Sequence, residues 1–189
     1  MQFVLCHPRL DEFRECSLEF LQRHHIDMKR VHVLVPGHMV DIFKQTGVNV
    51  HSISDSPVES GPFQDGVHMG KVRTQASQMF EVGEEIVELI DNITDITFQK
   101  RPVQDFMALM QECFKLLKGK IQMFGLNPGH LMGRSYAGRP DVSGLHQIYN
   151  GCVGFRNMRL TLTLPMREDL DRVMVIFSQG GSVLRRRGH

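Results

Sequence analysis

Residues 31–53 read VHVLVPGHMVDIFKQTGVNVHSI, a stretch in which a strand pattern gives way to a helix pattern and then returns. The runs over residues 31–35 and 48–53 are rich in valine, as strands commonly are. Between them, residues 39–45 have the length of a short helix, which Gly47 closes. Because a strand, a helix and a second strand follow one another, we expect a parallel sheet with right-handed crossovers.

The flanking segments extend this alternation toward both ends of the chain. Residues 3–6 form an apolar run suited to a strand buried on both faces, and residues 10–24 carry apolar side chains at helical spacing. A helix is expected over residues 71–81 and a fourth strand over residues 86–90. Ligands of such sheets bind at the carboxyl ends of the strands, so the residues directly after each strand are the first candidates for a site.

The second half of the chain has a weaker pattern. Its expected elements are a helix over residues 102–118, strands over 151–155 and 160–164, a helix over 168–177 and a last strand over 182–185. In the last helix, Leu170, Val173, Met174 and Phe177 share one face. Residues 125–144 contain five glycines and two prolines, which predict a long loop of the kind that often carries function.

The composition is that of a soluble globular chain, with 41% hydrophobic and 23% charged residues in a length of 189. This length predicts one domain. Lys and Arg number 22 against 21 Asp and Glu, so the formal net charge of +1 gives no overall attraction to nucleic acid or to an anionic membrane. No apolar run approaches the roughly 20 residues of a membrane span, and the cysteines lack zinc-module spacing. We expect reduced thiols and a cytoplasmic protein, or a nuclear one in a eukaryote.

Asp91 and Asn92 directly follow the expected fourth strand. At that place a carboxylate reaches a divalent cation and a substrate phosphate without being buried unpaired, and Mg²⁺ commonly takes one or two carboxylates together with phosphate oxygens. The alternative is a plain turn, because Asp and Asn both tolerate turn geometry. From these two residues alone, the turn is the simpler interpretation.

Glu168 and Asp169 open the expected last helix, with Asp171 close behind. Carboxylates at a helix N-terminus stabilise the helix through its dipole, so capping is one interpretation. The other interpretation is a general base that removes the proton of an acceptor hydroxyl.

Three basic residues lie close to the expected carboxyl edge of the sheet. Arg9 follows the first strand, and Lys71 and Arg73 begin the helix before the fourth strand. A guanidinium at this edge can engage diphosphate oxygens bidentately, although each side chain taken singly is more simply a solvated charge. The sequence has no Walker A motif, no GxGxxG after the first strand, and no GxSxG or HExxH, so the common ATPase, dehydrogenase, hydrolase and metalloprotease signatures are missing.

Several short segments stand in a characteristic order along nearly the whole chain. They are residues 3–6 with Pro8-Arg9, residues 31–38 leading to Phe43 and Gly47, Lys71-Val72-Arg73, Ile90-Asp91-Asn92-Ile93, Tyr149-Asn150-Gly151-Cys152-Val153-Gly154, Glu168-Asp169-Leu170-Asp171 and Gly180-Gly181. Together they resemble a compact glycosyltransferase of the GT-A type. The chain is most similar to the glycosyltransferases found beside DNA-base-oxidising dioxygenases in phages, fungi and kinetoplastids, a group that also resembles the C-terminal domain of the growth-regulating estrogen receptor binding protein.

This resemblance implies a fold as well as an activity. The expected fold is α/β, a single Rossmann-like GT-A domain over residues 1–189 with a mainly parallel central sheet flanked by helices. Residues 1–100 would form the half that binds the nucleotide sugar, and residues 101–189 the half that holds the acceptor and the catalytic base.

The resemblance also implies roles for individual residues. Asp91 takes the place of the acidic motif that binds a divalent metal, Mn²⁺ or Mg²⁺, and His189 would complete the metal shell. Glu168 and Asp169 match the pair that supplies the catalytic base. The residues expected to contact the UDP-sugar donor are Arg9, Lys71, Arg73 and Asn92. The chain departs from the family pattern at the metal motif, where Ile90 precedes the single acidic residue.

The implied function is metal-dependent transfer of a sugar from a UDP-sugar to a hydroxyl, with 5-hydroxymethyl pyrimidine in DNA as the acceptor that the subgroup indicates. The arginines available for DNA phosphates are Arg134, Arg139, Arg156, Arg159 and Arg185 to Arg187. Two alternatives stay open. One is a GT-A enzyme acting on protein or small-molecule hydroxyls, and the other is a non-catalytic interaction module that keeps the fold. No membrane partner is expected, and a phage-encoded protein would work in the host cytoplasm.

Overall fold

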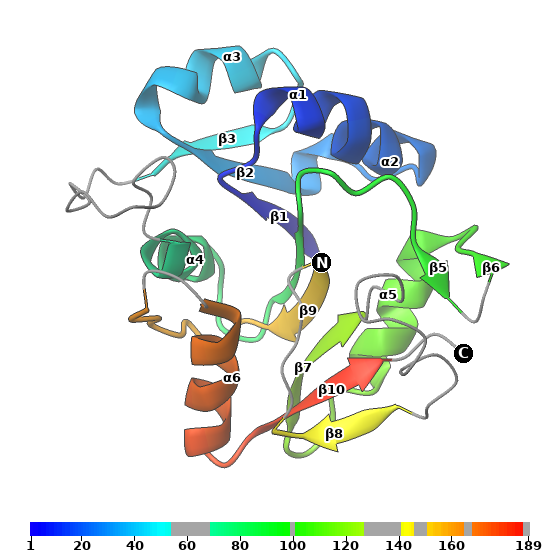
Figure 1. Cartoon of the computed structure of the whole chain (residues 1–189), viewed down its shortest axis with the longest axis vertical. Coiled ribbons are helices and arrows are strands. Elements are labelled where there is room, and N and C mark those ends of the chain that lie inside the picture. The colour runs from blue at the N-terminus through cyan, green and yellow to red at the C-terminus, as the bar shows by residue number, and fades with distance from the viewer. Residues whose placement is uncertain (54–68, 99–100, 127–140, 146–150, 165–167, 187–189) are drawn as a thin grey trace.

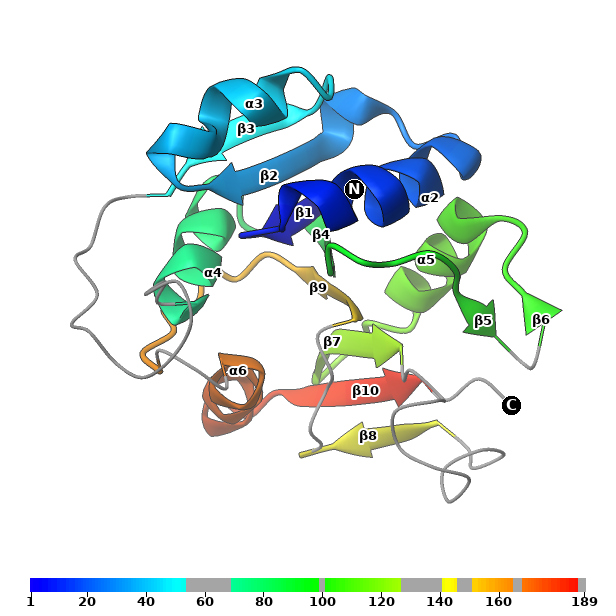
Figure 2. The ribbon, with the colours of Figure 1, turned by 45° about the horizontal axis from the view of Figure 1, so that its top comes forward.

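An eight-stranded sheet with helices on both faces forms the centre of the computed structural model (Figure 1, Figure 2). The structure describes residues 1–53, 69–98, 101–126, 141–145, 151–164 and 168–186. The strands are β1 (Gln2–Cys6), β2 (Val31–Val35), β3 (Asn49–Ser52), β4 (Glu85–Leu89), β5 (Thr97–Phe98), β6 (Arg101–Pro102), β7 (Ile121–Leu126), β8 (Val142–Gly144), β9 (Cys152–Arg156) and β10 (Ser182–Arg186). The helices are α1 (Leu10–Glu12), α2 (Leu18–Arg23), α3 (Val40–Lys44), α4 (Met69–Gln78), α5 (Phe106–Lys115) and α6 (Glu168–Ser178). Shorter helical turns are the π-helical turn Phe13–Ser17 between α1 and α2 and the 3-10 turns Met28–Arg30 and Gly37–Met39.

The strands of the main sheet lie in the order β3-β2-β1-β4-β9-β7-β10-β8. Strands β9 and β8 run antiparallel to their neighbours, and the other six share one direction. The predicted α/β fold with a mainly parallel sheet flanked by helices is therefore confirmed. The chain first builds β2 and β3 on one side of β1 and then returns to place β4 on its other side. This return creates a topological switch point between β1 and β4, where open α/β sheets bind their ligands.

The first four strands and the helices between them lie where the sequence predicts them, but the helix predicted over residues 102–118 is shorter. Helix α5 begins only at Phe106, because the Asp105 side chain caps it by accepting a hydrogen bond from the Ala108 amide at 2.8 Å. The prediction over residues 10–24 is right in extent, although a π-helical turn interrupts the α-helical geometry there.

The strand predicted over residues 160–164 is wrong. Side chains rather than a neighbouring strand satisfy its backbone: the Leu162 amide donates to Thr74 Oγ1 at 2.8 Å, and the Leu164 amide donates to Asp171 Oδ2 at 3.0 Å. An apolar run thus becomes an extended segment that ties α4 to α6 without entering the sheet.

The long loop predicted over residues 125–144 is wrong at both ends. Strand β7 continues to Leu126, and β8 covers residues 142–144, while residues 127–140 lie outside the described part of the chain. Strand β7 is paired on both sides, with β9 and β10, so sheet pairing outweighs the weak local pattern of the run IQMFGL.

Each face of the sheet has its own apolar core. Helices α1, α2, α3 and α5 pack on one face, and α4 and α6 pack on the other (Figure 2). Strand β4 shows the alternation: Val87 and Leu89 belong to the first core, and Ile86 belongs to the second. None of the helices in the described part of the chain has both the length and the apolar character that crossing a membrane requires.

The apolar face of α6 is only partly buried. Val173 is 1% exposed, but Leu170, Met174 and Phe177 are 38%, 49% and 48% exposed. The helix is rotated so that Arg172, which is 4% exposed, points inward. The buried side of α6 therefore combines the charged Arg172 with the apolar Val173 and Ile176.

Two histidines on neighbouring strands form a polar pair near the N-terminal end of β1. His32 Nδ1 lies 3.0 Å from His51 Nε2, and His32 Nε2 lies 3.3 Å from Gln2 Oε1. Burial, followed by the charge of His51, lowers the pKa of His32 to about 4, and burial also lowers the pKa of His51. Both imidazoles are therefore neutral in the folded protein at neutral pH.

We expect the free energy of unfolding to fall as the pH is lowered from about 6.5 toward 4. In that range the unfolded chain binds a proton at His32 that the folded protein does not bind, so stability is complete above the unfolded pKa and is lost below it. Urea unfolding at pH 7 and pH 5, followed by circular dichroism, should show a smaller pH effect in His32→Gln than in the wild type. His38→Gln, on the exposed turn after β2, is the control and should keep the wild-type pH effect. An unchanged pH effect in His32→Gln would contradict the assignment.

Candidate functional site

A cavity of about 240 Å³ opens at the switch point between β1 and β4. The residues that line it come from the ends of these two strands and from α4: Leu5, Cys6, His7, Pro8, Met69, Arg73, Glu88, Leu89, Ile90 and Asp91. Two residues that the sequence predicts for the site, Arg73 and Asp91, therefore line one cavity.

The chain turns sharply as it leaves β1. His7 has φ +54°, in the left-handed region that residues other than glycine seldom adopt, and its amide donates to the Leu34 carbonyl at 2.8 Å. Backbone conformations of this kind often occur at functional sites. Here the turn brings Pro8 into the lining of the cavity and places Arg9 in contact with Asp91, which also lines it.

Asp91 and Arg9 contact each other across the switch point. Asp91 Oδ2 accepts hydrogen bonds from the Arg9 amide at 2.9 Å and from Arg9 Nε at 3.2 Å, and the guanidinium also pairs with Glu12. The Asp91 side chain is 17% exposed, whereas the Arg9 side chain is 65% exposed. The structure thus joins a predicted metal ligand to a predicted nucleotide contact.

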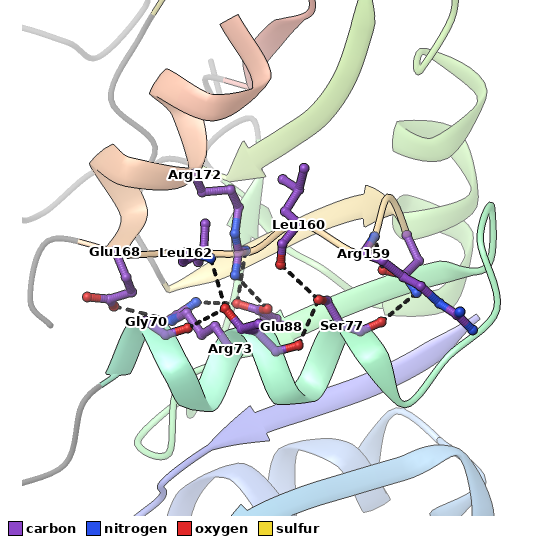
Figure 3. A network of polar contacts seen from close by, with 11 residues as sticks. Gly70, Arg73, Ser77, Glu88, Arg159, Leu160, Leu162, Glu168 and Arg172 are labelled. Carbon is purple, nitrogen blue, oxygen red and sulfur yellow. Dashed lines mark hydrogen bonds and ion pairs between the residues drawn. The ribbon is translucent and has the colours of Figure 1, made fainter. Parts of the chain in front are cut away.

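Four charged side chains form a buried network on the α4 and α6 side of the cavity (Figure 3). Arg172 donates to both carboxylate oxygens of Glu88, at 2.8 and 3.0 Å, and Arg73 also donates to Glu88. Arg73 Nε lies 3.2 Å from Glu168 Oε1. Arg73 therefore links Glu88 on β4 to Glu168 on α6, and each of these four side chains is at most about a tenth exposed.

The network keeps Glu88 ionised although it is deeply buried. Burial would raise the pKa of Glu88, but the charges and hydrogen bonds of Arg172 and Arg73 outweigh burial and lower it. The thiol of Cys6 behaves in the opposite way, because burial, and then the charge of Glu88, raises its pKa to about 12. Cys6 is therefore a neutral thiol at neutral pH, which makes it a poor nucleophile.

The other predicted site residues are less closely connected to the cavity. Lys71 and Asn92 are exposed, and Asp169 is half-buried beside Glu168 at the start of α6. His189 lies outside the described residues. Within the described ranges, three or more His, Cys, Asp or Glu side chains do not come together anywhere as a metal site.

Sequence patterns miss two members of the network, Glu88 and Arg172. One signal was available for Glu88, which stands alone among apolar residues in the run 86–90 and must therefore find a partner when that strand is buried. Arg172 gives no such signal, because the apolar residues Leu170, Met174 and Phe177 of the same helix indicate another inward face than the one that is buried. The pairing itself joins residues 84 positions apart, which no local pattern reveals.

A comparison with protein-family profiles found no match, and a comparison with curated proteins found no significant match. Among solved structures, one described as the crystal structure of a mycobacterial protein aligns with a TM-score of 0.57 and 12% identity, over 98% of this chain and 66% of that chain. The galactosyltransferase LgtC, solved with donor and acceptor sugar analogues, aligns with a TM-score of 0.48 and 11% identity, over 93% of this chain and 66% of that chain. The first alignment shows a shared fold, and the chain spans just under two thirds of each neighbour.

We expect Glu88→Gln to lower the free energy of unfolding by about 3 kcal/mol or more, because breaking a buried ion pair leaves guanidinium charge without compensation. Urea unfolding followed by circular dichroism measures this, since the chain has no tryptophan. Glu112→Gln is the matched control: Glu112 pairs with Arg186 at 3.4 Å but is 61% exposed, so its loss should cost at most about 1 kcal/mol. Equal losses in the two variants would show that the buried network is not a stabilising link.

Proposed function

We propose that the protein is a glycosyltransferase that binds a nucleotide diphosphate sugar in the cavity between β1 and β4 and transfers the sugar to a hydroxyl. The observation that carries this proposal is that Asp91 and Arg73 line one cavity at the switch point of the sheet, with Glu168 in contact with Arg73. The order of the sequence segments that resemble GT-A enzymes supports the same function.

In this proposal Arg73 contacts the diphosphate of the donor from the floor of the cavity, and Arg9 contacts it from the rim. Guanidinium groups suit this role because their donors match phosphate oxygens in pairs. Lys71 and Asn92, both exposed at the same edge, are assigned to the outer part of the donor. The nucleotide is taken to be uridine diphosphate, as the resemblance implies.

The charge balance of the site favours a divalent cation. Within the described residues, each guanidinium around the cavity is already ion-paired, so the positive charges are compensated before a ligand arrives. These pairs are Arg9 with Asp91 and Glu12, Arg73 with Glu88 and Glu168, and Arg172 with Glu88. A diphosphate entering such a site needs further positive charge.

Asp91 fits the cation that the proposal requires. Arg9 occupies its Oδ2, while Oδ1 has no hydrogen-bond partner among the described residues. Mg²⁺ and similar ions need only one or two carboxylates when phosphate oxygens and waters complete the shell. When bound, Mn²⁺ or Mg²⁺ would supply Lewis-acid stabilisation of the diphosphate leaving group. His189 stays a proposed second ligand.

The carboxylates at the start of α6 are proposed to serve the acceptor. Glu168 is buried against Arg73, which suits it to hold that guanidinium in place. Asp169 is half-buried one residue further on and is the better candidate to accept the proton of the attacking hydroxyl.

Two acceptor classes remain within this proposal. Resemblance supports 5-hydroxymethyl pyrimidine in DNA. Burial of Arg185 and Arg186, at 9% and 7% exposure in β10, favours protein or small-molecule hydroxyls, because these arginines do not form an exposed phosphate-binding surface. Two other arginines already donate hydrogen bonds to backbone carbonyls within the protein, Arg156 to that of Leu117 and Arg159 to that of Phe80. Assays with a panel of UDP-sugars, offering hydroxymethylated duplex DNA or a serine peptide, separate the two classes.

We expect wild-type protein to bind UDP in the presence of Mn²⁺, and Asp91→Asn to weaken this binding about tenfold or more, since a charge-assisted contact contributes about 1.5–3 kcal/mol. Calorimetry with Mn²⁺ and with a chelator measures the affinity and its dependence on metal.

Asp95→Asn is the matched control for this prediction. Asp95 lies four positions further along the chain, is 66% exposed and pairs with Arg23 away from the cavity lining, so its variant should bind UDP as the wild type does. Absence of UDP binding in the wild type, or equal binding by Asp91→Asn, would contradict the proposed function. UDP binding without transfer to any acceptor would support the non-catalytic module instead.

A further inference from the structure

A fully buried hydroxyl lies beside the turn that carries Asp91. Ser17 is 0% exposed and ends the π-helical turn Phe13–Ser17, in which the Leu18 amide donates to the Phe13 carbonyl five residues earlier. Single π-helical turns inside α-helices occur often at functional sites. The turn places a polar side chain on the face of the helix that packs against the sheet.

The Ser17 hydroxyl closes the turn after β4 from both sides. Its Oγ donates to the Ile90 carbonyl at 2.8 Å and accepts from the Ile93 amide at 3.3 Å. Asp91 and Asn92 lie between these two contacts. One hydroxyl therefore fixes the main chain immediately before and after the residues proposed to face the ligand.

The same helical segment also holds the Asp91 side chain. Arg9, the residue before α1, donates its amide to Asp91 Oδ2, and Ser17 bonds the main chain of the turn. The segment from Arg9 to Arg23 therefore holds the turn in two ways: Arg9 binds the Asp91 side chain, and Ser17 binds the main chain of the turn. With both contacts made, the direction of the carboxylate is set before any ligand binds.

We propose that Ser17 is a positioning residue that orients the Asp91 carboxylate toward the cavity and thereby sets the affinity for the ligand's diphosphate. This inference rests on the proposed function for its second half, while the orientation of Asp91 is a property of the protein alone. The two halves are tested separately.

The first test needs no ligand. Asp91→Ala is made in the wild type and in Ser17→Ala, and the unfolding equilibrium constant is measured in urea for all four proteins. Without the Ser17 hydroxyl, the turn no longer holds Asp91 against Arg9, so Asp91 should contribute less to stability. The fold-change in the unfolding constant caused by Asp91→Ala should therefore be clearly smaller in the Ser17→Ala background. An equal fold-change in both backgrounds overturns the inference.

The second test measures UDP binding with Mn²⁺ by calorimetry. Ser17→Ala should raise Kd about threefold to tenfold, because it removes both hydrogen bonds that hold the turn and a net hydrogen bond contributes about 0.5–1.5 kcal/mol. Ser77→Ala is the matched control, because the Ser77 hydroxyl is also buried and bonds the Thr74 and Leu160 carbonyls rather than the Asp91 turn. This control should lose stability while its Kd stays at the wild-type value.

The outcomes distinguish the inference from the proposed function. Equal Kd values for Ser17→Ala and Ser77→Ala overturn the role of Ser17 and leave the proposed function standing. Absence of UDP binding in the wild type overturns the proposed function, and the unfolding cycle then still decides whether Ser17 orients Asp91. Should Ser17→Ala fail to fold, Ser17→Cys, which keeps the size of the side chain and donates only weakly, replaces it in both tests.

Discussion

The structure depends on one buried carboxylate, Glu88, in the middle of the sheet. A lone ionised carboxylate at this depth would be very costly, and two guanidinium groups from different helices compensate it. Arg73 and Arg172 can both reach Glu88 only if α4 and α6 cover the same face of the sheet, and Figure 3 shows the two arginines meeting at Glu88. The same pairing holds Arg73 against the cavity at the switch point. Packing of the fold and placement of the candidate site thus share one electrostatic constraint.

The sequence predicts the first half of the fold well, because its strands and helices have strong local periodicity. Asp91 is found at the predicted edge of the sheet for the same reason, because a residue that follows a strand is placed by that strand. Arg73 lies near the start of α4, and its ion pairs with Glu88 and Glu168 hold it at the cavity. Local patterns fail where pairing decides the structure. Strand β7 is set by neighbours on both sides, and residues 160–164 leave the sheet because Thr74 and Asp171 bond their backbone.

Charges around the cavity also show why single residues in a sequence are weak indicators of function. Arg9, Arg73 and Glu168 each read as solvated or capping residues when taken alone, yet each has an ion-pair partner from a distant part of the chain. Once paired, these side chains are held in fixed positions, but together they add no net positive charge to the cavity. In the proposed function, the arginines would orient a diphosphate, and a further cation would be needed to balance its charge.

The two faces of the sheet contribute to the candidate site in different ways. The α4 and α6 face supplies charged groups locked by mutual ion pairs, so their positions are fixed as long as the core is intact. The opposite face supplies hydrogen bonds from Ser17 and Arg9 that hold the turn after β4. Asp91 lies where the two contributions meet, with one carboxylate oxygen bound by Arg9. In the proposed function, a cation would use the second oxygen without breaking the Arg9 pair, so the proposed ligand and the resting structure would not compete for the same atom.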